Sequence, residues 1–252
     1  MSRSKSAPRQ LLFWSFVLLM LALTGAFVAL GVWQMQRLAE KEALIAAVEQ
    51  RTGLPPAPPP PAAEWPALDP AGIEFTPLAL TGRFAADPPI RVFTSLAAST
   101  ARGEFSGPGY WIVAPFALED GGTVFVNRGF IPQEEAEAVP PAPQGLQTLT
   151  GLARAPERAS MFTPAANAAD RIEWVRDPER LAVLFDPALA PFAPFTLDQA
   201  AGAPGTLPQG GETVVEFPNN HLGYAITWFG FAAITPVLLG FWIWRQRTQR
   251  LR

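Results

Sequence analysis

A single histidine marks the most chemically distinctive position in the sequence. His221 is the only one among 252 residues, and it stands directly before an apolar run that begins at Leu222. A neutral imidazole can ligate a metal ion. Asn219 or Asn220 can cap a helix that starts here, which places His221 in the first turn, where the positive helix end disfavours imidazolium. Alternatively, a polar residue at an interfacial helix start satisfies backbone donors or lipid headgroups.

Aromatic and polar residues occur at helical spacing around this position. Tyr224 and Trp228 follow His221 by three and seven residues, so they share its helix face and can wall a flat ligand. Trp33 and Gln34 end an earlier apolar run and can form the opposite wall. The alternative for the aromatic residues is an interfacial belt, because Trp and Tyr gather where a membrane meets water.

Two arginines suit anion recognition or internal ion pairing. Arg37 lies one turn beyond Trp33, and its guanidinium offers a forked match to a carboxylate; the alternative is an ordinary stop-transfer anchor. Arg128 ends a β-prone piece, where we expect it to pair with an acid inside a folded domain. The acidic pairs at 119–120 and 134–135 lie in loop-like sequence, where solvated charge is the ordinary interpretation.

No residue pattern typical of an enzyme or a metal centre is found in the sequence. There is no Gly-rich phosphate loop, no Ser-His-Asp arrangement and no metal-spaced His cluster, so we expect that the protein is not an enzyme. The absence of cysteine excludes disulfides and thiolate metal sites. Four Met and one His provide too few soft ligands for a copper carrier.

Two uncharged runs are the elements that must position these residues. A helix needs about 20 apolar residues to cross a bilayer core, and the sequence predicts membrane-spanning helices at 11–33 and 219–244. A signal peptide is the alternative for the first run, which nevertheless exceeds the ~7–15 apolar residues of such peptides. Gly25 and Ala29 form a small-x-x-x-small pair, which predicts close packing of the two helices there.

The distribution of charge predicts an orientation. All 22 acidic residues but only 12 Lys and Arg lie between the runs, giving that segment a formal charge of −10, whereas the tails 1–10 and 245–252 carry +3 and +4. Positive flanks stay in the cytoplasm, so both termini are predicted to be cytoplasmic and the segment exported. Its acidity argues against nucleic acid partners. The composition, rich in Ala and Pro, and the short basic leader favour a bacterial inner membrane and a periplasmic domain.

The exported segment divides at a proline run. Good helix formers predict that the first helix continues outward before the prolines begin, so 34–62 is interpreted as a helix extension followed by a semi-rigid tether. The remainder, 63–218, alternates β-prone pieces with turn residues and predicts a compact antiparallel β domain. The turn at 119–122 has hairpin chemistry. Expected strands are 75–84, 90–95, 110–118, 123–128, 146–152 and 213–217, with a short helix at 176–185 and loops at 134–145 and 198–211. The predicted fold class is therefore an α+β membrane protein, in which two transmembrane helices flank the domain.

Five ordered segments together are similar to one known family. They are Leu30-Gly31-Val32-Trp33-Gln34 with Arg37 and Lys41, Pro108-Gly109-Tyr110, Val126-Asn127-Arg128-Gly129-Phe130-Ile131-Pro132, Trp174 with Arg176-Asp177, and Asn219-Asn220-His221-Leu222-Gly223-Tyr224-Ala225-Ile226-Thr227-Trp228-Phe229. Over about residues 30–244 the chain resembles the Surfeit locus protein one family, the membrane-bound assembly factors of haem-copper cytochrome c oxidase. It departs from the family at Glu40, where many relatives have an aromatic residue, and at Phe130, where Trp is usual.

The resemblance implies assistance rather than catalysis. It implies that the protein binds haem a at the outer junction of its two helices and promotes haem insertion into subunit I of the oxidase. Subunit I, membrane lipids and, as a further candidate, haem a synthase are the implied partners. The implied cofactor-binding residues are His221 as iron ligand, with Tyr224, Trp228, Trp33, Gln34 and Arg37 around it. The alternative is a scaffold without cofactor that stabilises oxidase subunits during assembly, in which His221 is structural.

Overall fold

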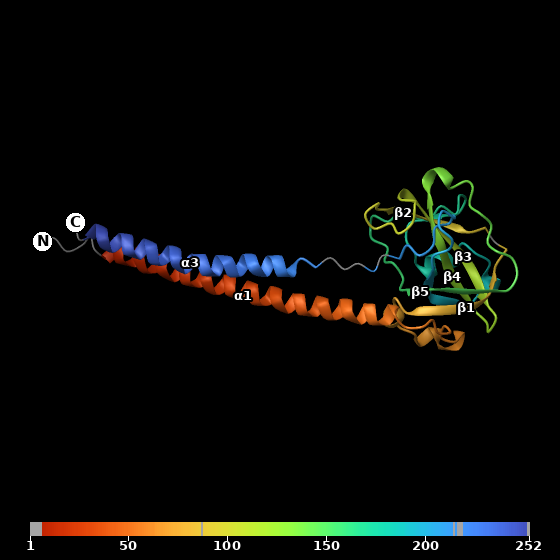
Figure 1. Cartoon of the computed structure of the whole chain (residues 1–252), viewed down its shortest axis with the longest axis horizontal. Coiled ribbons are helices and arrows are strands. Elements are labelled where there is room, and N and C mark those ends of the chain that lie inside the picture. Colours follow the sequence, from red (N-terminus) through yellow and green to blue (C-terminus); the bar gives the residue numbers. More distant parts are fainter. Residues whose placement is uncertain (1–6, 87, 214, 216–218, 251–252) are drawn as a thin grey trace. The chain divides into compact units, whose positions relative to one another are not determined.

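Two compact units make up the chain. The computed structural model describes residues 7–86, 88–213, 215 and 219–250. A helical unit lies within Met1–Ala47 and Glu216–Arg252, and a β-rich unit comprises Val48–Val215. Figure 1 shows the helices in red to orange and in blue, and the strands of the second unit in the colours between. Each unit is described by itself.

Long apolar helices form the first unit. α1 spans Ala7–Thr52 and α3 spans His221–Arg250. Both contain stretches long and apolar enough to cross a membrane, which is consistent with a membrane protein. α1 continues without a break through the segment 34–51, where the sequence predicts a helical extension. It ends next to Gly53 and the proline run, which cannot continue a helix.

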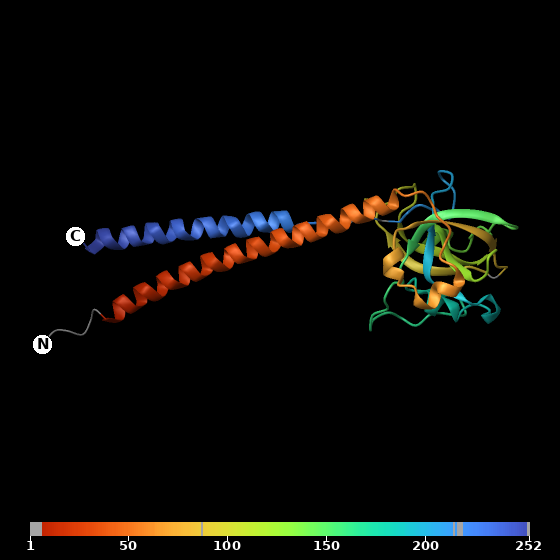
Figure 2. The same ribbon diagram turned by 90° about the horizontal axis from the view of Figure 1, so that it is seen from below.

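The two helices run alongside each other in opposite directions (Figure 1, Figure 2). Aromatic rings join them along their length. Phe27 stacks on Trp228 with ring centroids 5.8 Å apart, and Phe13 stacks on Trp242 at 5.2 Å. Ring contacts of this kind add to the packing of the two apolar surfaces.

At Gly31, α1 packs closely against the side chain of Phe229 in α3. A Cβ atom added there would lie 2.6 Å from the ring of Phe229, so only glycine fits without displacement of that ring. The predicted contact at Gly25 and Ala29 is wrong, because both residues are exposed and a Cβ added at Gly25 would have nothing within 4 Å. Both sites have small residues, but only Gly31 lies on the face that meets α3.

The second unit is a β-barrel with two additional strands. Its strands are β1 (Pro77–Phe84), β2 (Ile90–Leu96), β3 (Gly107–Leu118), β4 (Thr123–Pro132), β5 (Gln147–Arg154), β6 (Ile172–Glu173) and β7 (Phe192–Gln199). They pair in the order β1-β5-β7-β4-β3-β2-β6, and an additional pairing of β1 with β3 closes a barrel of five strands. Its short helices are η1 (Ala62–Ala67), η2 (Pro70–Ile73), η3 (Gln133–Glu135), α2 (Pro178–Ala182) and η4 (Pro187–Leu189).

Most of the predicted strands are confirmed, with shifted ends. The pieces predicted at 75–84, 90–95, 110–118, 123–128 and 146–152 correspond to β1 to β5. The hairpin is confirmed as well, since Ala117 pairs with Thr123 across a turn in which Gly121 and Gly122 have φ of +100° and +81°. The strand predicted at 213–217 is not found at Thr213 or Val215, and its other residues lie outside the described part of the chain.

The predicted all-antiparallel sheet is wrong at two pairings. β4 pairs in parallel with β7, and β2 pairs in parallel with β6. β7 is absent from the predicted strands, because Pro191 and Pro194 are residues that usually interrupt strands. Its end also overlaps the loop predicted from residue 198. The register of β4 and β7 shifts between Thr123 and Phe125, opposite Phe192 and Thr196. Pro194 lies within that irregularity, where a missing N–H does not interrupt the ladder.

The proline-rich segment interpreted as a tether is attached to β1. The N–H of Ala57 donates to the carbonyl of Pro77 at 3.1 Å, and the carbonyl of Ala57 accepts from Ala79 at 2.8 Å. Ala57 thus forms a parallel bridge opposite Leu78.

The predicted helix at 176–185 is shorter than expected, since α2 ends at Ala182.

Two apolar clusters lie on opposite faces of β4, and all ten of its residues are buried. The barrel interior contains Val124, Val126, Phe116, Phe195 and Leu197, among others. The outer cluster places Phe125 against Ile90 and Val92 of β2 and Leu181 and Phe185 around α2. α2 therefore packs over the outer face of β4 through Leu181.

Candidate functional site

His221 is the first residue of α3 and contacts α1. Its Nδ1 lies 2.7 Å from Oε1 of Gln34. Gln34 is buried, with 8% of its surface exposed, and His221 is partly buried. The backbone N–H of His221 donates to Oδ1 of Asn219 at 3.4 Å, so Asn219 supplies a polar partner at the start of the helix. The structure thus brings together His221 and Gln34, two of the predicted site residues.

The hydrogen bond with Gln34 defines the chemistry of the imidazole ring. With Oε1 of Gln34 facing the ring, the amide oxygen accepts the hydrogen bond and Nδ1 is the donor. The lone pair then lies on Nε2. Within the described part of the chain, Nε2 has no hydrogen-bond partner. In this tautomer, Nε2 is the ring nitrogen that can act as a ligand.

Charged groups of α1 lie beside the ring. A cleft of about 290 Å³ is lined by His221, Arg37, Glu40, Lys41 and Leu44. Arg37 forms an ion pair with Glu40 at 2.6 Å, and both side chains are more than half exposed. Such an exposed pair contributes little to stability, so Arg37 can exchange its partner for another carboxylate.

The predicted aromatic residues separate into two groups. Trp228 is half-buried between the helices, where it stacks on Phe27. Trp33 and Tyr224 are 50% and 57% exposed and lie outside the helix–helix contact. Only Trp228 therefore lies between the helices with His221 and Gln34.

A second polar centre lies in the β-rich unit around Asp198, at the end of β7. This carboxylate is 5% exposed. It accepts hydrogen bonds from Arg176 at 2.6 Å, Arg154 at 3.1 Å, Asn127 at 2.9 Å and Thr213 at 2.8 Å. Burial alone would raise the pKa of Asp198, but the charges of Arg176 and Arg154 and the hydrogen bonds outweigh it and lower that pKa below its usual value. The group is thus held ionised.

Two of the sequence motifs meet at Asp198. Asn127 comes from β4, and its Oδ1 also accepts from the N–H of Gly129 at 3.1 Å. Gly129 has a φ of +136°, and a Cβ added there would lie 2.3 Å from the backbone of Gln209, so this position of the motif requires glycine. Arg176 comes from the Trp174 motif and also binds Glu157 at 2.6 Å. Both motifs therefore stabilise the domain.

Asp198 is not among the residues expected from the sequence to form a site, because it falls at the start of the loop predicted at 198–211. Arg128, which follows Asn127 in β4, has a different role from the expected one. The guanidinium of Arg128 donates to the carbonyls of Pro140 and Pro141 at 2.8 and 3.1 Å, and the described residues include no acid paired with it. Burial lowers the pKa of Arg128. The acidic pairs at 119–120 and 134–135 are exposed, as expected.

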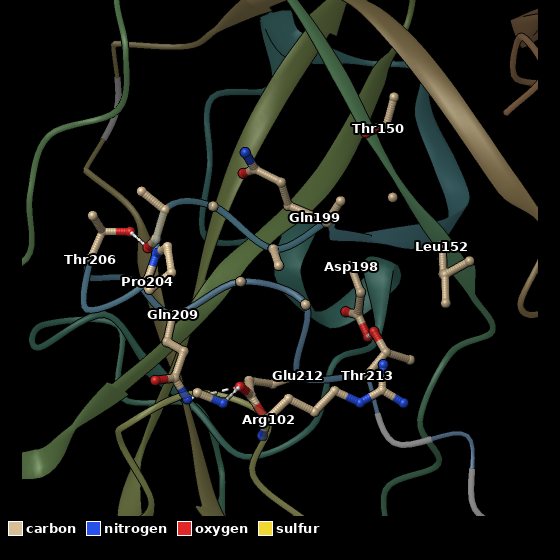
Figure 3. Close-up of a pocket in the computed structure, with 18 of the residues that line it drawn as sticks. Arg102, Thr150, Leu152, Asp198, Gln199, Pro204, Thr206, Gln209, Glu212 and Thr213 are labelled. Carbon is tan, nitrogen blue, oxygen red and sulfur yellow. Dashed lines mark hydrogen bonds between the residues drawn. The ribbon is translucent and has the colours of Figure 1, made fainter.

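A cavity of about 770 Å³ adjoins Asp198. Figure 3 shows the side chains of Asp198 and Thr213 pointing toward one another at its side, with Thr150 and Leu152 contributed by β5. Next to Thr213, the buried carboxylate of Glu212 accepts from the backbone N–H groups of Arg102 and Gly103, both at 2.8 Å. The buried carboxylates of this cavity are thus occupied by bonds within the domain.

Comparison with known proteins gives consistent matches. The chain matches the model of the SURF1 family over residues 21–233, a range that includes Gln34, His221 and the barrel. A SURF1-like protein of Monosiga brevicollis is 32% identical over 254 residues, which cover 94% of this chain and 88% of that protein. Surfeit locus protein 1 of Mus musculus and of Homo sapiens are each 31% identical, covering 90% of this chain and 74% and 76% of those proteins.

Replacing Asp198 by Asn is expected to destabilise the β-rich unit by about 3 kcal/mol at neutral pH, because the buried Arg176 and the partly buried Arg154 each lose one of their two counter-charges. The pKa of Asp198 is lowered in the folded state, so its contribution is fully present above the unfolded value near pH ~4 and is lost as the pH falls through the lower folded value. The free-energy difference between wild type and variant should therefore shrink below about pH 4.

Hydrogen exchange of β4 amides in the full chain, measured from pH 7 down to pH 3, would report this difference for the barrel alone. Asp186→Asn is the control, since Asp186 caps η4 by accepting from Ala188 and asparagine caps equally well. A difference for Asp198→Asn that stays constant or grows in acid would contradict the expectation.

Proposed function

This chain belongs to the SURF1 family, and from that premise we propose that it is an assembly factor for haem-copper cytochrome c oxidase. In this role it binds haem a, promotes haem insertion into subunit I and catalyses no reaction of its own. Subunit I is the principal partner, and haem a synthase is a further candidate. The observation that carries the haem-binding part is the imidazole of His221, held through Nδ1 by Gln34.

The chemistry of the donor set supports haem rather than a bare metal ion. Haem brings an iron that takes a protein imidazole as axial ligand. Histidines that ligate metals usually donate their other ring N–H to an oxygen acceptor, which is the arrangement of His221 and Gln34. The described residues include no group of three or more His, Cys, Asp or Glu that could hold a metal ion. A ligand that supplies most of its own iron coordination therefore fits this position better.

The neighbouring groups suit the periphery of haem. Arg37 can exchange Glu40 for a propionate, because a guanidinium forms forked hydrogen bonds with carboxylates. Trp33 and Tyr224 are exposed and can contact a ligand or lie at a membrane interface. The cleft of about 290 Å³ is slightly smaller than the usual range for binding pockets, which is about 300–1,000 Å³. A shallow site of this kind suits a protein that holds haem and passes it on.

We propose that the protein is located in a bacterial inner membrane. In this arrangement α1 and α3 span the bilayer, both termini are cytoplasmic and the β-rich unit is periplasmic. The support is the charge distribution, −10 between the apolar runs and +3 and +4 in the tails.

A scaffold without cofactor remains a second candidate because of one contact. The hydrogen bond of His221 with Gln34 also joins α3 to α1, so it can serve helix packing alone. In that case subunit I would be stabilised by contacts with the protein, and haem would reach it separately.

Reporter fusions test the orientation. An alkaline phosphatase fused after Gln144 should be active, since the enzyme requires export, whereas the same reporter fused after residue 250 should be inactive. Both fusions must be present in the membrane at similar levels, checked by immunoblot. The reverse activity pattern would contradict the proposed topology.

Replacing His221 by Ala tests haem binding. The variant should lose most of its bound haem when produced with the haem a synthesis enzymes, because the iron loses its nitrogen ligand. Soret absorbance per purified protein is the measurement. Thr227→Ala is the matched control, since Thr227 is a polar residue of α3 whose hydroxyl donates only to Gly223 of the same helix. Equal haem content and an unchanged spectrum in the His221 variant would favour the scaffold.

A further inference from the structure

We propose that Gln34 is the positioning residue of the helix junction, which fixes the tautomer of His221 so that Nε2 is the ligating nitrogen. The inference rests on the proposed function where it concerns haem, but the tautomer itself is a property of this chain alone. It assigns a specific role to a residue that the sequence alone places in the wall of the predicted site.

The burial of Gln34 supports this role. Gln34 is 8% exposed although it is polar and belongs to an apolar helix, and a buried amide requires hydrogen-bond partners. The partner of its Oε1 is Nδ1 of His221 at 2.7 Å. Gln36, two positions further along α1, is exposed. The difference shows that position 34 faces α3 whereas position 36 does not.

The packing of α1 against α3 places the side-chain amide of Gln34 next to the imidazole ring of His221. Gly31 lies one turn before Gln34 on the same face of α1 and packs against Phe229 of α3. That contact allows the two backbones to approach closely. Gln34 then reaches the first turn of α3, where His221 lies partly buried. The ring orientation is thus determined by a buried partner on the other helix.

The direction of the hydrogen bond determines which nitrogen is available. Oε1 can only accept, so a neutral His221 carries its proton on Nδ1 and its lone pair on Nε2. An acceptor behind a ligating histidine fixes ring orientation and raises ligand basicity, and removing such an acceptor typically weakens metal affinity 10–100-fold. Gln34 therefore acts on haem through His221 and needs no contact with haem itself.

The tautomer of His221 can be tested by NMR without overlapping signals, because His221 is the only histidine in the sequence. The full chain is labelled with ¹⁵N-histidine, purified without a polyhistidine tag in detergent micelles, and studied without haem at a pH at which the ring is neutral. Long-range ¹H–¹⁵N spectra distinguish a protonated ring nitrogen from one with a lone pair. In the wild type we expect Nδ1 to be protonated and Nε2 to carry the lone pair.

The variants separate positioning from folding. Gln34→Leu should remove the preference for the Nδ1–H form, Gln34→Glu should retain it because a carboxylate also accepts, and Gln36→Leu should match the wild type. Circular dichroism and the NMR signals of the barrel show whether each variant is folded. A wild-type ring protonated at Nε2, or the Nδ1–H form unchanged in folded Gln34→Leu, would overturn the proposal.

Haem titration of the same four proteins gives the second measurement. The expected result is 10–100-fold weaker haem a binding by Gln34→Leu, with near wild-type binding by Gln34→Glu and Gln36→Leu. Equal affinity of Gln34→Leu and wild type would overturn the positioning role. If none of the proteins bound haem, the proposed haem site would fail, whereas the NMR result would still decide whether Gln34 fixes the ring.

Discussion

The close packing of α1 and α3 at Gly31 is the constraint on which the helix junction depends. A Cβ atom at position 31 would lie 2.6 Å from the Phe229 ring, so a residue larger than glycine would displace that ring and disturb the packing of the two helices. One turn further along the same face, Gln34 then reaches His221 at 2.7 Å. The spacing of Gly31 and Gln34 in the first motif therefore has a physical explanation. Gly31 allows α1 and α3 to pack closely, and Gln34 forms a hydrogen bond across this contact.

The β-rich unit has its own polar centre with a different purpose. Asp198 is buried and ionised, and it accepts hydrogen bonds from Asn127 of β4 and from Arg176 in the segment before α2. A buried carboxylate requires such partners, which explains why two motifs that are far apart in the sequence meet at this residue. The motifs of the barrel thus stabilise its fold, whereas those of the helices form the candidate ligand site. The two groups need not share a function to occur in one family.

Local sequence signals predicted much of this structure, and non-local contacts explain what was missed. The helices, five strands and the 119–122 hairpin follow from apolar runs and turn residues, and His221 was found because it is unique. β7 was hidden by Pro191 and Pro194, and its parallel pairing with β4 depends on a long connection that no local pattern reveals. Asp198 and Gly31 acquire their roles only through partners on other elements. Gly25 and Ala29 are small enough for close helix packing, but they lie on a face of α1 that does not meet α3.

The haem a content of subunit I tests most directly whether His221 serves oxidase assembly. Oxidase would be isolated from a strain lacking this gene and its relatives, complemented with wild type, His221→Ala or Thr227→Ala, and haem a would be quantified per subunit I polypeptide. We expect haem a to be low without the gene although the polypeptide is made, and to be restored by wild type and Thr227→Ala but not by His221→Ala. Full haem a occupancy in the strain without the gene would contradict the assembly role, and full restoration by His221→Ala would contradict the haem site.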